Sequence, residues 1–228
     1  MNRLLAVLLM FALGCGSSTS PATSPRVEPA QTAAPTPTPR NVLADLPHER
    51  VDYWVERFSR GDKRPEIAEA FARKPQVEAM IAEKLRGQAM PEELIYLAMA
   101  ESGLNPNAGS AAGAIGIWQL VPDTARRYGL KVDETVDERR DPEKATNAAL
   151  LYLAYLYQRF GSWYLAAAAY NAGPNRVARI MTEATGSERG TDADYYRIWD
   201  QLPGETRDYI PAAIALMRIG RDAARYGF

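Results

Sequence analysis

One glutamate in this sequence stands where a carboxyl group would be expected to hold its proton. Glu101 follows the uncharged, mostly apolar residues 94–100 and is followed two positions later by Gly103. The apolar run predicts a buried helix, and the glycine predicts its end. Burial and the negative pole of a helix C-terminus both disfavour a charged carboxylate. A carboxyl group with a raised pKa can act as a general acid, for example on a glycosidic oxygen; the alternative is a solvated glutamate at a helix end.

The composition excludes several other catalytic chemistries. The 228 residues include one cysteine, Cys15, and one histidine, His48, which lies in a proline-flanked segment ahead of the helical region. A nucleophile activated by histidine and a zinc site of histidine and cysteine ligands are therefore excluded, and no glycine-rich phosphate loop is present. The formal net charge of −1 gives no electrostatic reason to expect a nucleic acid as partner. Carboxylates are the expected catalytic groups, without metal or cofactor.

The N-terminus has the features of an exported lipoprotein. Residues 1–14, MNRLLAVLLMFALG, have one early arginine followed by an apolar run, which is typical of a signal peptide. Small residues precede Cys15, as in a lipobox, where the cysteine receives lipid and becomes the new N-terminus. Gly16 favours the outer membrane over the inner membrane of a Gram-negative bacterium. We therefore predict a lipid anchor on the periplasmic face of the outer membrane; the alternative is a secretory signal with an unmodified cysteine.

Residues 15–47 are expected to be a disordered tether. They are rich in Ser, Thr, Ala and Pro and contain no aromatic side chain. Such a composition cannot bury a core, and the stretch PTPTP favours extended polyproline II. A tether of this length would hold a folded domain tens of ångströms from the membrane.

From residue 48 onward the apolar spacing is helical, and no alternating strand is convincing. Helices are expected in VDYWVERFS, PEIAEAFA, PQVEAMIAEKL, MPEELIYLAMAES, DPEKATNAALLYLAYLYQRF, SWYLAAAAYNAG, PNRVARIMTEA and ETRDYIPAAIALMRIGRDAARY. The glycine-rich GAIGIWQL is expected to form a loop or a short hairpin. The fold class is all-α, with a helical segment at 48–90 packed on a domain spanning 91–228.

Prolines and glycines predict where these helices begin and end. Pro65 and Pro75 each stand in the first turn of a separate helix, and Asp141 caps the helix that ends at Gly161. Pro211 predicts a break or kink in the last helix. The stretch RRDPEK is expected to be a solvated helix start, and the aromatic residues of LYLAYLYQRF to be mostly core, with one or two of them in a cleft.

Three short motifs occur in order along the helical region. They are Glu101-Ser102, the segment GIWQLVP at residues 116–122, and AYNAGP at residues 169–174. They resemble the ES, G-[LI]-[MW]-Q-[LFI]-[MV]-P and AYNAGP motifs of the lytic transglycosylases of the soluble-lytic-transglycosylase type, a lysozyme-like family that cleaves peptidoglycan. Trp118 and the segment WDQLPGETRDYIPAAIALMRI resemble the membrane-bound type D branch. The resemblance implies a lysozyme-like transglycosylase domain with additional N-terminal helices.

The resemblance also implies roles for single residues. Glu101 would be the catalytic acid and base. Residues implied to bind substrate are Ser110, near the substrate N-acetyl group, Gln119, Tyr170, Asn171, Glu205 and Tyr209. Val121 stands where many relatives have methionine, at a position that contacts sugar. From the residues alone, Gln119 could also be a satisfied buried amide, and Tyr170 a core side chain.

The implied reaction uses one carboxylate, whereas most glycosidases use two. Glu101 would protonate the oxygen between N-acetylmuramic acid and N-acetylglucosamine and then act as base on the muramoyl 6-hydroxyl, which leaves a 1,6-anhydro end. The implied partners are peptidoglycan glycan strands and, through the lipid anchor, a membrane. Spacing alone does not position a second acid, so the alternatives are a hydrolytic muramidase and a non-catalytic peptidoglycan-binding lipoprotein.

Overall fold

The computed structural model describes residues 42–228, and this part of the chain is all-α, as predicted. Its α-helices are α1 (Glu49–Ser59), α2 (Arg64–Gly87), α3 (Ile95–Ser102), α4 (Pro122–Arg127), α5 (Pro142–Phe160), α6 (Trp163–Ala172), α7 (Pro174–Thr185), α8 (Asp192–Arg197) and α9 (Gly204–Arg221). The predictions of a signal peptide at 1–14, of a lipidated Cys15 and of a tether up to residue 41 lie outside the described residues. Within residues 42–228, no helix is long and apolar enough to cross a membrane.

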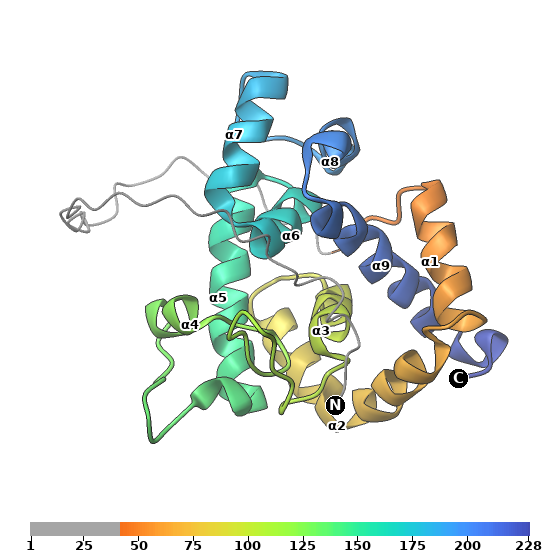
Figure 1. Cartoon of the computed structure of the whole chain (residues 1–228), viewed down its shortest axis with the longest axis vertical. Coiled ribbons are helices and arrows are strands. Elements are labelled where there is room, and N and C mark those ends of the chain that lie inside the picture. Colours follow the sequence, from red (N-terminus) through yellow and green to blue (C-terminus); the bar gives the residue numbers. More distant parts are fainter. Residues whose placement is uncertain (1–41) are drawn as a thin grey trace.

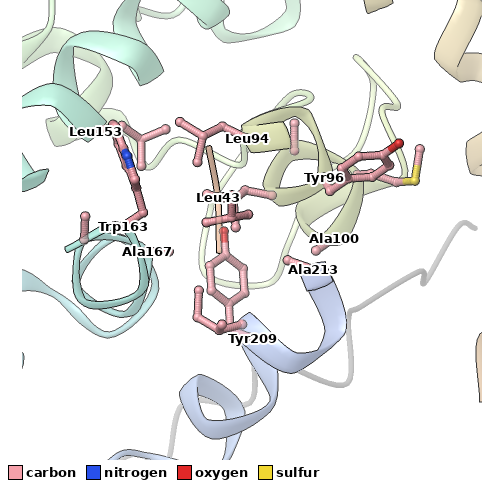
Figure 2. Packing of buried hydrophobic residues seen from close by; sticks show 14 of the residues in the cluster. Leu43, Leu94, Tyr96, Ala100, Leu153, Trp163, Ala167, Tyr209 and Ala213 are labelled. Atoms are coloured by element: carbon pink, nitrogen blue, oxygen red, sulfur yellow. The ribbon is translucent and has the colours of Figure 1, made fainter. Parts of the chain in front are cut away.

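The short helix α3 lies in the middle of the fold (Figure 1) and packs against α9 and α2. Helix α1 runs beside α9, while α6 packs against α5, α7 and α9. In Figure 2, Ala100 of α3 lies beside Ala213 of α9, and both side chains are buried. Small side chains at this contact let the two helices approach closely. Glu101 is therefore carried by a helix whose other residues are all buried.

Several predicted helix ends are confirmed by their caps. The Asp141 carboxylate accepts hydrogen bonds from the backbone N–H groups of Glu143 and Lys144 at the start of α5. Gly161 ends the same helix in the left-handed conformation, with φ of 75°. At the start of α6, the Ser162 hydroxyl accepts a hydrogen bond from the backbone N–H of Leu165. These caps pair polar backbone groups that a helix end leaves free.

The prediction that Pro75 opens a separate helix is wrong. Helix α2 runs without interruption through Pro75. Ile67 and Ala70 before the proline and Val77 and Ile81 after it are all buried on the same core. An interior proline costs about 3 kcal/mol, whereas each buried aliphatic side chain contributes about 1.5–3 kcal/mol. The continuous apolar face therefore outweighs the hydrogen bond that Pro75 cannot make.

Of the break or kink predicted at Pro211, the break does not occur, because helix α9 is continuous through this residue. Proline has no N–H to bond the carbonyl four residues earlier, which belongs to Arg207. That carbonyl instead accepts from the Tyr195 hydroxyl and from the Trp199 indole N–H, both at 2.9 Å. Two aromatic side chains outside the helix thus replace the missing donor, and α9 continues.

The last residues of the predicted 15–47 tether pack on the helical domain. Leu43 is fully buried, and the Ala44 carbonyl accepts a hydrogen bond from the Tyr164 hydroxyl at 2.7 Å. Asp45 forms an ion pair with Arg218 of α9. The expected loop at residues 113–120 is also present, as isolated bridges joining Gly109, Ile115 and Leu120.

Candidate active site

Glu101 lies in the last turn of α3, and its side chain is only partly exposed. Gly103 ends the helix with φ of 60°, as predicted. Burial raises the pKa of Glu101 to about 8; the Tyr209 hydroxyl opposes this rise, and the charge of Glu205 adds to it. A carboxyl group with such a pKa is mostly protonated at neutral pH, which is the state that a general acid requires.

Two tyrosines lie close to this carboxyl group. The Tyr209 hydroxyl of α9 is buried and near enough to Glu101 to affect its pKa, but it forms no hydrogen bond of normal geometry with any described residue. The Tyr170 hydroxyl of α6 donates to the Trp118 carbonyl at 2.7 Å. Burial raises the pKa of both tyrosines well above the usual value, and the Glu101 charge adds to the rise. Both are therefore neutral hydroxyl groups at any physiological pH.

The loop that follows α3 is tied back to the last turn of that helix, beside Glu101, by a side-chain hydrogen bond. Ser102, the partner of Glu101 in the ES pair, donates to the Ile117 carbonyl at 2.8 Å. Gln119 adopts a left-handed backbone conformation, with φ of 46°. Its amide nitrogen donates to the carbonyls of Gly116, at 2.9 Å, and Ala108, at 3.3 Å. Part of the Gln119 side chain thus holds the loop, as the alternative of a satisfied amide implied.

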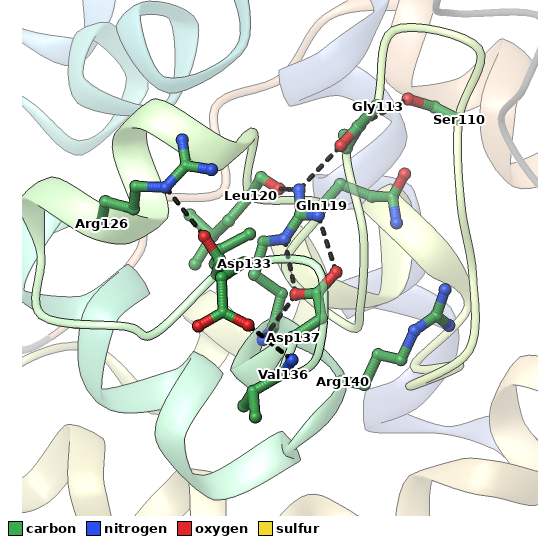
Figure 3. Close-up of polar contacts among 12 residues, drawn as sticks. Ser110, Gly113, Gln119, Leu120, Arg126, Asp133, Val136, Asp137 and Arg140 are labelled. Atoms are coloured by element: carbon green, nitrogen blue, oxygen red, sulfur yellow. Dashed lines mark hydrogen bonds and ion pairs between the residues drawn. The ribbon is translucent and has the colours of Figure 1, made fainter.

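Arg139 fixes the same loop from the other side. It lies in the short 3₁₀ helix η2 (Glu138–Arg140) and is only 4% exposed. Its guanidinium donates to the carbonyls of Gly113, at 2.7 Å, and Leu120, at 3.0 Å, and pairs with Asp137 (Figure 3). A Cβ on Gly116 would overlap the Arg139 carbonyl oxygen. The solvated helix start predicted for RRDPEK is therefore wrong for its first residue, which is a buried support of the loop.

Helices α6 and α9 supply the opposite wall. The Asn171 side chain bridges them: its nitrogen donates to Glu205 at 3.3 Å, and its oxygen accepts from the Thr206 hydroxyl at 2.8 Å. Burial raises the pKa of Glu205, and the hydrogen bond from Asn171 opposes that rise. The two carboxyl groups thus have different surroundings, since Glu205 has an amide donor and Glu101 has only a nearby phenol.

A cleft of about 500 Å³ brings together five of the seven predicted site residues, which are Glu101, Gln119, Tyr170, Asn171 and Glu205. Ser110 and Tyr209 do not line it. The Ser110 hydroxyl accepts from the Ala114 N–H within the loop, and Tyr209 is buried near Glu101. Among the described residues, no group of three or more His, Cys, Asp or Glu side chains could hold a metal ion. The cleft offers one protonated acid, amide groups and hydroxyl groups, which suits acid catalysis on a polar, uncharged bond.

Comparison with known proteins decides the family. The Transglycosylase SLT domain matches residues 78–191. The chain belongs to this family. It is 41% identical over 148 residues to the membrane-bound lytic murein transglycosylase D of Escherichia coli (strain K12), covering 64% of this chain and 32% of that protein. It is 32% identical over 136 residues to the soluble lytic murein transglycosylase of the same strain, covering 57% of this chain and 20% of that protein. The chain thus spans a third or less of the length of these two relatives.

The matched SLT domain contains part of the site. It includes Glu101 and the loop at residues 113–120, but it ends at residue 191, ahead of Glu205 and Tyr209 on α9. Helix α9 packs directly on α3 and α6. In this SLT protein, the residues beyond the matched domain therefore complete the cleft and affect the pKa of Glu101.

Sequence reasoning missed one part of the cleft of this SLT protein. Its wall also includes Arg127, Tyr128, Tyr152, Tyr155 and Arg159. The expectation that one or two aromatic residues of LYLAYLYQRF line a cleft is confirmed for Tyr152 and Tyr155. Arg127, Tyr128 and Arg159 are the residues that it missed, and the signal that could have found the first two is their position at the end of α4, soon after the GIWQLVP motif.

Proposed function

We propose that this protein is a peptidoglycan lytic transglycosylase with Glu101 as its catalytic acid and base. The observation that carries the proposal is the raised pKa of Glu101, to about 8, in a cleft lined by Gln119, Tyr170 and Asn171. Membership of the SLT family and the names of the two relatives support it. The substrate is the bond between N-acetylmuramic acid and N-acetylglucosamine.

The reaction needs one proton that leaves Glu101 and returns. Glu101 protonates the glycosidic oxygen, the bond to C1 breaks, and the substrate's own N-acetyl oxygen stabilises the positive charge at C1. The Glu101 carboxylate then removes the proton of the 6-hydroxyl, whose oxygen attacks C1 and closes the 1,6-anhydro ring. Because this nucleophile is part of the same sugar, no water is consumed and attack is intramolecular. The Tyr209 hydroxyl, which has no other partner among the described residues, can donate to Glu101 while it is ionised.

The remaining predicted site residues bind and orient the glycan. Asn171, Gln119 and Glu205 line the cleft with amide and carboxyl side chains, and Tyr170 lines it with an aromatic one. Ser110 would act from the loop beside the cleft, near the N-acetyl group. Hydrolysis by a muramidase would need a second carboxylate to activate water, and Glu205 is the other acid that lines the cleft.

Mass spectrometry of digested cell walls tests the proposal. A transglycosylase leaves an anhydro end that is lighter by one water than the reducing end left by a muramidase. Glu101→Gln should fold, bind glycan and cut nothing, whereas Glu205→Gln should retain anhydro products at a lower rate. Reducing ends as the main product would establish the muramidase instead, and absence of cleavage by the unaltered protein would favour a binding lipoprotein.

We also propose that residues 1–14 are removed and that Cys15 anchors the protein by lipid to the outer membrane. The apolar leader and the small residues before Cys15 support this. Replacing Cys15 by alanine should move the protein from the outer-membrane fraction to the soluble periplasm. An unchanged membrane fraction would contradict the anchor.

A further inference from the structure

A row of aromatic rings leads from Glu101 along the wall of the cleft. Tyr170, whose pKa is affected by the Glu101 charge, lies with its ring 5.2 Å from that of Tyr152, and the Tyr152 ring lies 5.1 Å from that of Tyr128. Beyond these rings the wall is formed by Tyr155 and by two arginines, Arg127 and Arg159. We call Arg127, Tyr128, Tyr152, Tyr155 and Arg159 the tyrosine–arginine end of the cleft.

The tyrosine–arginine end carries a positive charge that no described residue neutralises. Burial raises the pKa of Tyr152 to about 12, and the charges of Arg127 and Arg159, both nearby, oppose this rise. Arg159 is paired with Glu188 at 2.8 Å. The Arg127 side chain is exposed and makes no hydrogen bond or ion pair with any residue that the structure describes. Its guanidinium is therefore free to bind an anionic group of a ligand.

The same end offers apolar surface beside the charge. Tyr155 is 45% exposed and Val121 is 39% exposed, although both are large hydrophobic side chains and both line the cleft. A second hollow, of about 440 Å³, shares Arg159 and Asn175 with the cleft and continues it between α5 and α7. The end of the cleft therefore has a ring face on which a sugar can stack, a free cation, and space beyond for a substituent.

We propose that the tyrosine–arginine end is a subsite for a sugar that bears a carboxylate, with Arg127 as the residue that binds the carboxylate. The proposal rests on the proposed function, because it assumes that a glycan strand occupies the cleft. Two sources could supply the group: the lactyl carboxylate of a muramic acid without peptide, or a carboxylate of the attached peptide. A chain of N-acetylglucosamine alone has neither, so Arg127 would distinguish peptidoglycan from chitin-like glycans.

Binding measurements with Glu101 replaced by glutamine test this without cleavage. The probes are a chito-oligosaccharide, glycan strands freed of peptide by an amidase, and glycan fragments that keep their peptides. Arg127→Ala, added to Glu101→Gln, should weaken binding of at least one anionic glycan about tenfold, as expected for one charged hydrogen bond. Arg127→Lys should recover part of the affinity. The matched control is Arg60→Ala, because Arg60 does not line the cleft and 78% of its side chain is exposed.

Each outcome either supports or overturns the proposal. Loss confined to stripped strands identifies the lactyl group, and loss confined to peptide-bearing fragments identifies the peptide; both support a carboxylate subsite. Unchanged affinity for both anionic glycans, or an equal loss for the chito-oligosaccharide, would overturn it. Cleavage by the protein with Glu101 intact is measured separately, so failure of the proposed function shows as absent cleavage and not as a change at Arg127.

Discussion

Replacing Glu101 by glutamine should stabilise the folded protein, and more so as the pH rises. The folded state holds the Glu101 proton up to a pKa of about 8, whereas the unfolded chain releases it near the ordinary value of 4.5. Between these values the folded state binds one proton more than the unfolded state, so the free energy of unfolding falls as the pH increases. Glutamine has no proton to release, so the variant does not lose stability in this way as the pH increases.

The size of the effect follows from the shift. Each pKa unit corresponds to about 1.4 kcal/mol, so the stability difference between Glu101→Gln and the unaltered protein should grow by at most about 4 kcal/mol between about pH 5 and about pH 8.5. Glu101 is partly exposed at the cleft, and water there reduces the penalty for ionisation. We therefore expect an increase of about 2 kcal/mol.

Urea unfolding of both proteins at the two pH values measures this difference, because titrating groups that do not interact with Glu101 contribute equally to both proteins. Glu134→Gln is the matched control for the change from glutamate to glutamine, since Glu134 is exposed and does not line the cleft. A difference for Glu101→Gln that does not change with pH would refute the argument that Glu101 is protonated because it is buried.

Three further predictions concern the chemistry and the loop. The kcat/KM for peptidoglycan should fall as the pH rises through about 8, because Glu101 then loses the proton that it donates, and a rate profile flat to about pH 10 would contradict this. Gly116→Ala should lower the free energy of unfolding by roughly 2–4 kcal/mol, since its Cβ meets a backbone oxygen, whereas Gly113→Ala, which has positive φ but open space, should cost about 1 kcal/mol. Arg139→Ala should cost about 3–5 kcal/mol in thermal unfolding, because it leaves Asp137 unpaired and removes donors from two loop carbonyls; a cost below about 1 kcal/mol would show that the buried pair is dispensable.

The sequence predicts this fold well where the determinants are local. Asp141 and Gly161 delimit α5 because a cap depends on residues within one turn. The burial and raised pKa of Glu101 follow from the uncharged run before it, because a helix that is apolar on nearly every side has to be buried. The position of the acid could thus be inferred without the fold.

What the sequence does not reveal depends on distant contacts. Arg139 looks like part of a charged surface turn, and only its contacts with carbonyls 26 and 19 residues away show that it is buried. Pro75 has the signature of a helix start, but burial on both sides keeps α2 continuous. The tyrosine–arginine end combines residues of α4 and α5, so its charge cannot be recognised before the two helices are placed together.

The loop that carries Gln119 explains why the motifs contain more than the catalytic groups. Three side chains from different elements donate to its carbonyls: Ser102 of α3 to Ile117, Tyr170 of α6 to Trp118, and Arg139 of η2 to Leu120. Each donor anchors one backbone position, so the loop cannot move relative to α3 without breaking a buried hydrogen bond, at a cost of about 1–3 kcal/mol.

Two of these donors, Ser102 and Tyr170, belong to the motifs, so the motif residues have two physical roles. In the proposed reaction Glu101 supplies the proton, whereas its neighbour Ser102 ties the loop to the same helix turn. Tyr170 both lines the cleft and holds the loop, so neither interpretation made from the sequence is complete by itself. An acid that must reach a glycosidic oxygen needs the opposite wall at a fixed distance, since small displacements greatly slow a positioned proton transfer. The spacing of the motifs therefore reflects the need to hold that wall as much as the need for an acid.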